Sequence, residues 1–245
     1  MTGPVIFALF CSAGLIVGSF CTNLALRTGR GEQALTGASH CEACGVKLGY
    51  VATAPVISYL ALKGACAQCG SRIDPAHIVG EIAGAAIALG ALTVADPRRA
   101  ALMAVIGFAL LTASLVDLKT KRLPDHLTLV IAVASLALAI LRPSPTLLVS
   151  VIASLATFVT LGGLRRAFET LKGDPGLGFG DVKLLSALAL WLGAATPIAI
   201  AIASFAGLAV FALHKPRGGR MPFGPMIAGA SWVVGMGLEA RWWSI

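Results

Sequence analysis

Charged residues are scarce in this chain. They make up 12% of its 245 residues, whereas 57% of the residues are hydrophobic. Soluble domains carry about 25% charged residues, so this composition excludes an ordinary soluble domain and predicts an integral membrane protein. The formal net charge of +8 would suggest a nucleic-acid partner in a soluble protein. In a membrane protein it indicates basic cytoplasmic loops instead, and we predict no nucleic-acid partner.

A charged segment is also missing from the N-terminus. The chain begins "MTGPVIFALFCSAGLIVGSFCTNLALR", with no basic residue ahead of its apolar stretch. That stretch is longer than the roughly 7–15 residues usual for the apolar core of a signal peptide. We therefore expect residues 1–26 to form a retained first transmembrane helix.

The rest of the chain has no tandem repeat and no long low-complexity tract. A bilayer core needs roughly 20 mostly apolar residues per helix, and this criterion predicts an all-α polytopic membrane protein with about eight transmembrane helices. The helices are expected at about 4–26, 78–95, 100–117, 126–141, 146–164, 182–195, 197–213 and 223–240. Residues 27–77 are the one polar piece large enough to fold, and 78–245 would form a seven-helix membrane domain.

The distribution of lysine and arginine predicts how the helices are oriented. If the N-terminus lies outside, the inner segments hold 15 of the 19 basic residues. The outer side then keeps only Arg98, Arg99, Arg142 and Arg241. Cytoplasmic loops carry an excess of lysine and arginine, so both termini are expected outside the membrane. Arg98 and Arg99 are the one local exception to this rule.

Four cysteines in 27–77 form two CxxC pairs, separated by 21 residues. This is slightly more than the roughly 15–20 residues usual in a zinc ribbon. Gly45 and Gly70 follow the two pairs and would allow a tight turn around a metal. Four thiolates suit tetrahedral Zn²⁺, and disulfides are disfavoured in the cytoplasm. We predict a structural zinc site; two redox pairs or unrelated thiols are the alternatives. The predicted ligands are Cys41, Cys44, Cys66 and Cys69.

Two aspartates stand at the predicted inner ends of different helices. Asp117 ends the third segment, and Asp181 follows the glycines of "GLGFGD". An acid at the membrane edge is costly and therefore suggests function. Two carboxylates that share one proton form an aspartic protease pair, in which one activates water and the other polarises the scissile carbonyl. The glycines would allow backbone conformations that other residues resist, and they would leave room for an extended peptide to approach.

Structural roles for the acids stay open at this point. Asp181 could cap its helix, and Asp117 could pair with Lys119 or Lys121. Asp125 directly precedes the fourth segment, where capping is its expected role. A transporter or proton channel could also use paired acids as a relay, although a relay favours acids near the midplane and inverted repeats. A zinc-dependent assembly module on a membrane anchor would explain the cysteines but neither aspartate.

An ordered set of motifs resembles the prepilin peptidases, also called type IV leader peptidases. "GSFCTNLALR" (18–27) is followed by the CxxC loop with "PVISYLALKGAC", then "PAHIVGE", "VDLKTKRLPDHLT", "GFGDVKLL" and "MPFGP" (221–225). GxGD alone is short and is shared with presenilin-type proteases; the ordered set is far more specific.

The resemblance implies a membrane aspartic endopeptidase with Asp117 and Asp181 as its catalytic pair. It implies prepilin and pseudopilin substrates, cleaved at the cytoplasmic face of the bacterial inner membrane. Many members then methylate the new N-terminus with S-adenosylmethionine. One departure bears on that second step: "VATA" precedes Pro55, where many relatives carry an acidic residue and an asparagine. Supporting loop residues would be Gly178, Gly180, Pro222, Phe223, Gly224 and Pro225.

Overall fold

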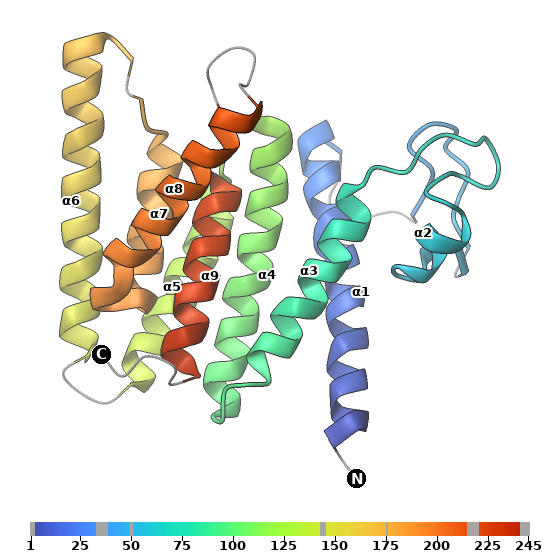
Figure 1. The fold of residues 1–245 in the computed structure, drawn as a ribbon, viewed down its shortest axis with the longest axis horizontal. Helices are drawn as coiled ribbons and strands as arrows, with labels where there is room; N and C mark the ends of the chain where they lie inside the picture. The colour runs from blue at the N-terminus through green and yellow to red at the C-terminus, as the bar shows by residue number, and fades with distance from the viewer. Residues whose placement is uncertain are drawn as a thin grey trace. The chain divides into compact units, whose positions relative to one another are not determined.

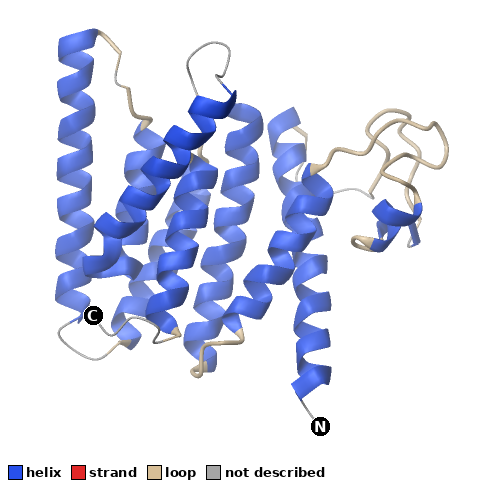
Figure 2. Ribbon diagram, viewed as in Figure 1, coloured by secondary structure: helices blue, strands red, loops and turns tan. Residues whose placement is uncertain are grey.

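A computed structural model describes residues 3–32, 39–49, 51–142, 146–174, 176–214 and 221–240. In these ranges the chain is helical, with two isolated β-bridges and no β-strand (Figures 1 and 2). It divides into two compact units, Met1–Leu92 and Thr93–Ile245. Unit 1 contains α1 (Gly3–Arg30), η1 (Val51–Thr53), α2 (Ile57–Ala61) and α3 (Ala76–Ala91). Unit 2 contains α4 (Pro97–Thr120), α5 (Asp125–Leu141), α6 (Thr146–Lys172), α7 (Phe179–Leu192), η2 (Gly193–Ala195), α8 (Thr196–His214) and α9 (Gly224–Glu239).

The predicted all-helical class is confirmed, and a helix lies on each of the eight predicted ranges. Four helical stretches are long and apolar enough to cross a membrane, whereas α3 and α5 are shorter apolar helices. The number of membrane crossings therefore stays a prediction, as does the division at residues 26 and 77. The four stretches are Gly3–Arg30, Pro97–Thr120, Thr146–Lys172 and Phe179–Leu213.

In unit 1, α1 and α3 pack with their backbones in contact. A Cβ atom added to Gly18 would lie 2.4 Å from the Gly80 carbonyl oxygen, and one added to Gly84 would lie 2.3 Å from that of Gly14. Each helix thus presents two glycines four residues apart, which lets helices in a membrane approach closely. Only hydrogen atoms fit at these four positions.

The core of unit 2 is built around α7, which is buried along almost its whole length against α5, α6 and α9. Trp191 is its largest fully buried side chain, and a Cβ atom on Gly235 would lie 2.1 Å from the Trp191 ring. α6 and α8 expose many large apolar side chains, including Val159, Phe205 and Leu208. These exposed faces suit contact with lipid.

The helices of unit 2 run in alternating directions (Figure 1). One end, here called the Asp117 end, gathers 117–125, 176–181 and 221–226. The opposite end, here called the Glu239 end, gathers 96–99, 139–142, 191–197 and 236–240. The described parts of the unit 2 segments that were predicted to lie inside thus meet at one end of this unit.

The glycine contacts of unit 1 predict a stability effect. Gly84→Leu places a side chain where the α1 backbone lies, so α1 and α3 must separate. We expect the free energy of unfolding of unit 1 to fall by about 1–3 kcal/mol or more. Thermal unfolding in detergent, with limited proteolysis to localise the change, measures this. Ala86→Leu, at an exposed position of the same helix, is the matched control, and equal behaviour of the two variants would contradict the packing.

Candidate active site and cysteine cluster

Asp117 lies in the last turn of α4 and is buried. Its Oδ2 atom accepts a hydrogen bond from the backbone N–H of Gly224 at 2.8 Å. α4 ends at Lys121, which takes a left-handed conformation (φ 54°) and donates its N–H to the Asp117 carbonyl oxygen at 2.8 Å. A buried carboxylate needs such a donor because an unpaired one is costly in an apolar setting. Asp117 is thus tied to the start of α9.

Gly224 is the first residue of α9 and touches the Asp117 carboxylate directly. A Cβ atom at this position would lie 2.8 Å from Asp117 Oδ2 and 3.2 Å from its Cβ, so only glycine fits. Phe223 precedes the helix, and Pro225 occupies its first turn, where a missing N–H costs nothing. The positive end of the α9 dipole therefore faces Asp117.

Asp181 is the third residue of α7 and is half-buried. It lies near enough to Asp117 for the two carboxylates to interact electrostatically. The N-cap position of α7 is Gly178, and no side-chain hydrogen bond caps this helix. Asp181 therefore does not take the N-cap role that its sequence position also allowed. The two aspartates come from different helices and converge at the Asp117 end.

Each glycine of "GLGFGD" has a different role. Gly176 has a positive φ of 63°, which glycine adopts without strain. Gly178 has an ordinary extended backbone, but a Cβ atom there would lie 2.7 Å from Asp181 Oδ2. A Cβ atom on Gly180 would lie 3.1 Å from the Cβ of Leu123, in the connection between α4 and α5. Gly178 and Gly180 thus provide space and do not adopt unusual dihedral angles. The sequence predicted both roles for these glycines.

Asp125 differs from its predicted role. It is the first residue of α5, the N-cap is Pro124, and no side-chain hydrogen bond caps the helix. The Asp125 carboxylate instead forms an ion pair with Lys183, one helical turn beyond Phe179. The Lys183 ammonium also lies 5.3 Å from the centre of the Phe179 ring. The capping prediction was wrong because a lysine on a neighbouring helix offers this carboxylate a charged partner.

The four predicted cysteines of unit 1 form one cluster, with their Sγ atoms all within 4.8 Å of one another. The two CxxC turns have the same geometry. Gly45 donates to the Cys41 carbonyl oxygen and Gly70 to that of Cys66, both at 2.9 Å. Both glycines have positive φ, 71° and 69°. The predicted use of Gly45 and Gly70 in tight turns is therefore confirmed.

Two of the four thiols have a lowered pKa, which suits metal ligands, whereas burial and the neighbouring thiols raise the pKa of Cys44 to about 11. Backbone N–H groups of Cys44 and Ala43 lower the pKa of the Cys41 thiol to about 6. Hydrogen bonds from Ser71 lower the pKa of the Cys69 thiol. The Cys41 and Cys69 sulfur atoms lie 3.9 Å apart, and a tetrahedral site with Zn–S bonds of about 2.3 Å has S···S edges of about 3.8 Å. The four thiols thus lie close enough together to hold one metal ion.

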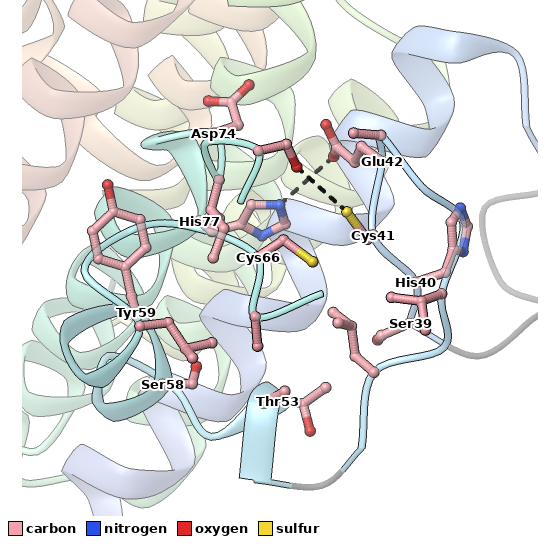
Figure 3. A pocket seen from close by; sticks show the side chains of 18 of the residues that line it. Ser39, His40, Cys41, Glu42, Thr53, Ser58, Tyr59, Cys66, Asp74 and His77 are labelled. Carbon is pink, nitrogen blue, oxygen red and sulfur yellow. Dashed lines mark hydrogen bonds and ion pairs between the residues drawn. The ribbon is translucent and has the colours of Figure 1, made fainter. Parts of the chain in front are cut away.

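A cavity of about 490 Å³ lies beside this cluster in unit 1. Figure 3 shows Glu42 and His77 facing each other there; Glu42 also forms an ion pair with Arg30 at 2.8 Å. Ala52 and Thr53, at the departure noted in the sequence, line the same cavity. No sequence motif pointed to Glu42, His77 or Arg30, because they are isolated charged residues in a polar segment.

The base of the cavity is fixed by Glu81 of α3. This buried carboxylate accepts hydrogen bonds from Ser19 Oγ at 2.8 Å and from the Val56 N–H at 2.7 Å. Val56 has a positive φ of 61°, a strained conformation for a β-branched residue. Glu81 therefore connects the motifs "GSF", "PVISYL" and "PAHIVGE" through one side chain.

Comparison with known proteins identifies two matching family models. Residues 12–95 match the bacterial peptidase A24 N-terminal domain, and residues 104–212 match the type IV leader peptidase family. No solved structure matches the chain.

Several curated relatives have the name prepilin leader peptidase/N-methyltransferase. That of Burkholderia pseudomallei (strain K96243) is 39% identical over 197 residues, 78% of this chain and 64% of the relative. That of Dichelobacter nodosus is 33% identical over 204 residues, 82% of this chain and 71% of the relative. That of Aeromonas hydrophila is 31% identical over 203 residues, 80% and 70% of the two chains. The chain thus spans less than two thirds of the Burkholderia relative. The motifs, the helices and these matches agree, and the chain belongs to the type IV leader peptidase family.

Proposed function

We propose that this chain is a membrane-embedded aspartic endopeptidase that removes the leader peptides of type IV prepilins and pseudopilins. The observation that carries the proposal is the convergence of Asp117 and Asp181 at one end of unit 2, with Gly224 donating to Asp117. The names of the relatives supply the substrate class. The transporter alternative has no comparable support, because both acids lie at helix ends.

The arrangement of the pair suggests different roles for its two members. Asp117 is buried and accepts the Gly224 N–H at the positive end of α9, which favours a negative charge. Asp181 is half-buried and stands beside it. We assign the shared proton to Asp181, which then donates a hydrogen bond to the scissile carbonyl oxygen. Asp117 accepts a proton from water as the water oxygen attacks the carbonyl carbon, and that proton passes to the leaving amine.

The proposed location follows from the charge distribution. A prepilin has a basic leader and an apolar helix, so its scissile bond lies at the membrane surface. We place the Asp117 end at the cytoplasmic face of the bacterial inner membrane, with both termini outside. The alternating helices of unit 2 and the basic residues at 118–125 and 165–183 support this orientation. The lipid bilayer then contacts the exposed apolar faces of α6 and α8.

The first prediction of the proposed function concerns catalysis. Asp117→Asn and Asp181→Asn should each lower kcat/KM for a recombinant prepilin in detergent by about 10⁴-fold or more. An amide can neither accept the water proton nor hold the shared one. The double variant should be no worse than either single variant, because the acids act as one unit. Asp125→Asn, with its exposed carboxylate, is the control and should retain activity. Cleavage near the wild-type rate by either single variant, correctly inserted, would refute the mechanism.

The second prediction concerns zinc. We infer that Cys41, Cys44, Cys66 and Cys69 hold one structural Zn²⁺ ion, which would supply folding free energy to a loop with little core of its own. Cys41→Ser or Cys69→Ser should reduce the metal content of purified protein from about one Zn²⁺ per chain to a small fraction, and should raise proteolysis in 39–74. Cys11→Ser, in α1 and away from the cluster, should keep the metal. Elemental analysis decides the matter, and a metal-free native protein with a protected loop would rule zinc out.

A second activity, N-methylation of the new N-terminus, is proposed for the unit 1 cavity. The relatives' names support it, and a cavity of about 490 Å³ is large enough for S-adenosylmethionine, with both acidic and basic side chains in its lining to meet the charged groups of the cofactor. When bound, the cofactor supplies a methyl group to an amine. Ala52 and Thr53 line this cavity and offer it neither a charge nor an amide group.

Intact-mass analysis separates the two activities. A prepilin incubated with the protein should lose its leader without S-adenosylmethionine. The mature product should gain about 14 Da, one methyl group replacing one hydrogen, only when the cofactor is added. Asp181→Asn should still methylate a synthetic mature pilin N-terminus, because the cavity belongs to the other unit. Cleavage with no mass gain at saturating cofactor would leave this chain a peptidase alone.

A further inference from the structure

A buried charge cluster lies at the Glu239 end of unit 2, outside the candidate active site. The Glu239 side chain has no exposed surface and forms ion pairs with Arg99 and Arg142. Glu239 Oε1 also accepts a hydrogen bond from Trp191 Nε1 at 3.2 Å. The guanidinium of Arg142 donates in addition to the Trp191 carbonyl oxygen at 2.6 Å. One carboxylate thus holds side chains from three other segments.

The position of Glu239 shows that the cluster does not serve its own helix. Glu239 is the last residue of α9, where the negative end of the helix dipole disfavours a carboxylate. A lysine or arginine would stabilise this helix end better. Burial adds a desolvation penalty that only well-placed partners offset. The carboxylate is therefore explained by its partners on other helices.

Two of those partners, Arg99 and Trp191, stand on the helices that carry the candidate catalytic aspartates. Arg99 lies in the first turn of α4, whose last turn holds Asp117. Trp191 lies in the last turn of α7, whose first turn holds Asp181. Glu239 ends α9, whose first residue is Gly224. The three helices that meet at the Asp117 end are thus also joined at their opposite ends, by a single carboxylate.

Hydrogen bonds and ion pairs are directional, so those at the Glu239 end fix the position of each helix along its axis. Apolar packing fixes this axial position less strictly. α9 spans about 22 Å from Gly224 to Glu239 at about 1.5 Å per residue. Over that length a helix is stiff, so a shift at one end reaches the other. The Gly224–Asp117 hydrogen bond of 2.8 Å would be lost after a shift of about 1 Å. A misplacement of that size can cost about 10²-fold in rate.

We propose that Glu239 is a positioning residue, which sets the axial register of α4, α7 and α9 and thereby the geometry of the Asp117–Asp181 pair. This inference rests on the proposed endopeptidase function. Glu239 touches neither substrate nor water at the site; it acts through Arg99, Trp191 and the helices that carry them.

Three variants test the proposal in detergent with a recombinant prepilin. Glu239→Gln and Arg99→Gln should each lower kcat per folded molecule by about 10-fold or more, while KM changes less than about threefold, because the substrate contacts remain. Arg99→Lys keeps a charge for Glu239 and should recover much of the loss. Arg98→Gln is the matched control, since the neighbouring Arg98 is exposed; it should stay within about twofold of the wild type.

Hydrogen–deuterium exchange gives a readout that does not depend on cleavage. In Glu239→Gln the peptide 221–226, which contains the Gly224 N–H, should exchange faster, although it lies a full helix away from the substitution. Faster exchange confined to 236–240, with kcat per folded molecule unchanged, would overturn the proposal and leave a purely local stabilising role. If Glu239→Gln does not fold, the comparison of Arg99→Gln, Arg99→Lys and Arg98→Gln decides. A wild type that fails to cleave any prepilin would refute the proposed function, and the exchange result would still stand for or against the coupling.

Discussion

The hydrogen bond from the Gly224 N–H to Asp117 is the contact on which the candidate active site depends. It stabilises a buried carboxylate without introducing a second charge, so Asp117 stays available for proton transfer. It also requires α9 to begin at this point, and the residues around Gly224 meet that requirement. Phe223 packs against Gly207 of α8, where a Cβ atom would lie 2.8 Å from the Phe223 ring. The motif "MPFGP" therefore starts α9 next to Asp117.

In both units, glycines leave the space that lets polar groups reach fixed positions. In unit 1, the glycines of α1 and α3 bring the backbones together and place Ser19 beside Glu81. In unit 2, Gly178 leaves space for the Asp181 carboxylate. A methyl group at any of these positions would separate atoms that must touch. Glycine therefore acts here mainly through its small size, and through its dihedral freedom at turns such as Gly45 and Gly70.

The sequence predicted the helical class and the position of two acids at helix ends, because both signals are local. Long apolar runs identify helices, and an aspartate at the edge of such a run is rare enough to be noticed. The cysteine cluster was predictable for the same reason, since the CxxC spacing reflects a local turn. Asp125 was misjudged because its partner Lys183 lies 58 residues away in sequence. The joint role of Arg99, Arg142 and Glu239 was equally hidden, because 140 residues separate Arg99 from Glu239.

The buried cluster also bears on the exception to the charge rule that orients the chain, because Arg99 belongs to the cluster, whereas the neighbouring Arg98 is exposed. The predicted outer side carries four basic residues, among them Arg99 and Arg142. Both form ion pairs with Glu239 inside the protein. A buried carboxylate therefore balances their charge, which is not a free charge in a loop. A rule based on positive charge in loops counts them as free loop charges, since sequence alone does not reveal their shared partner. Once these two are set aside, the contrast between the basic Asp117 end and the Glu239 end becomes sharper. The same carboxylate that joins the three helices thus pairs with two of the four basic residues on the predicted outer side.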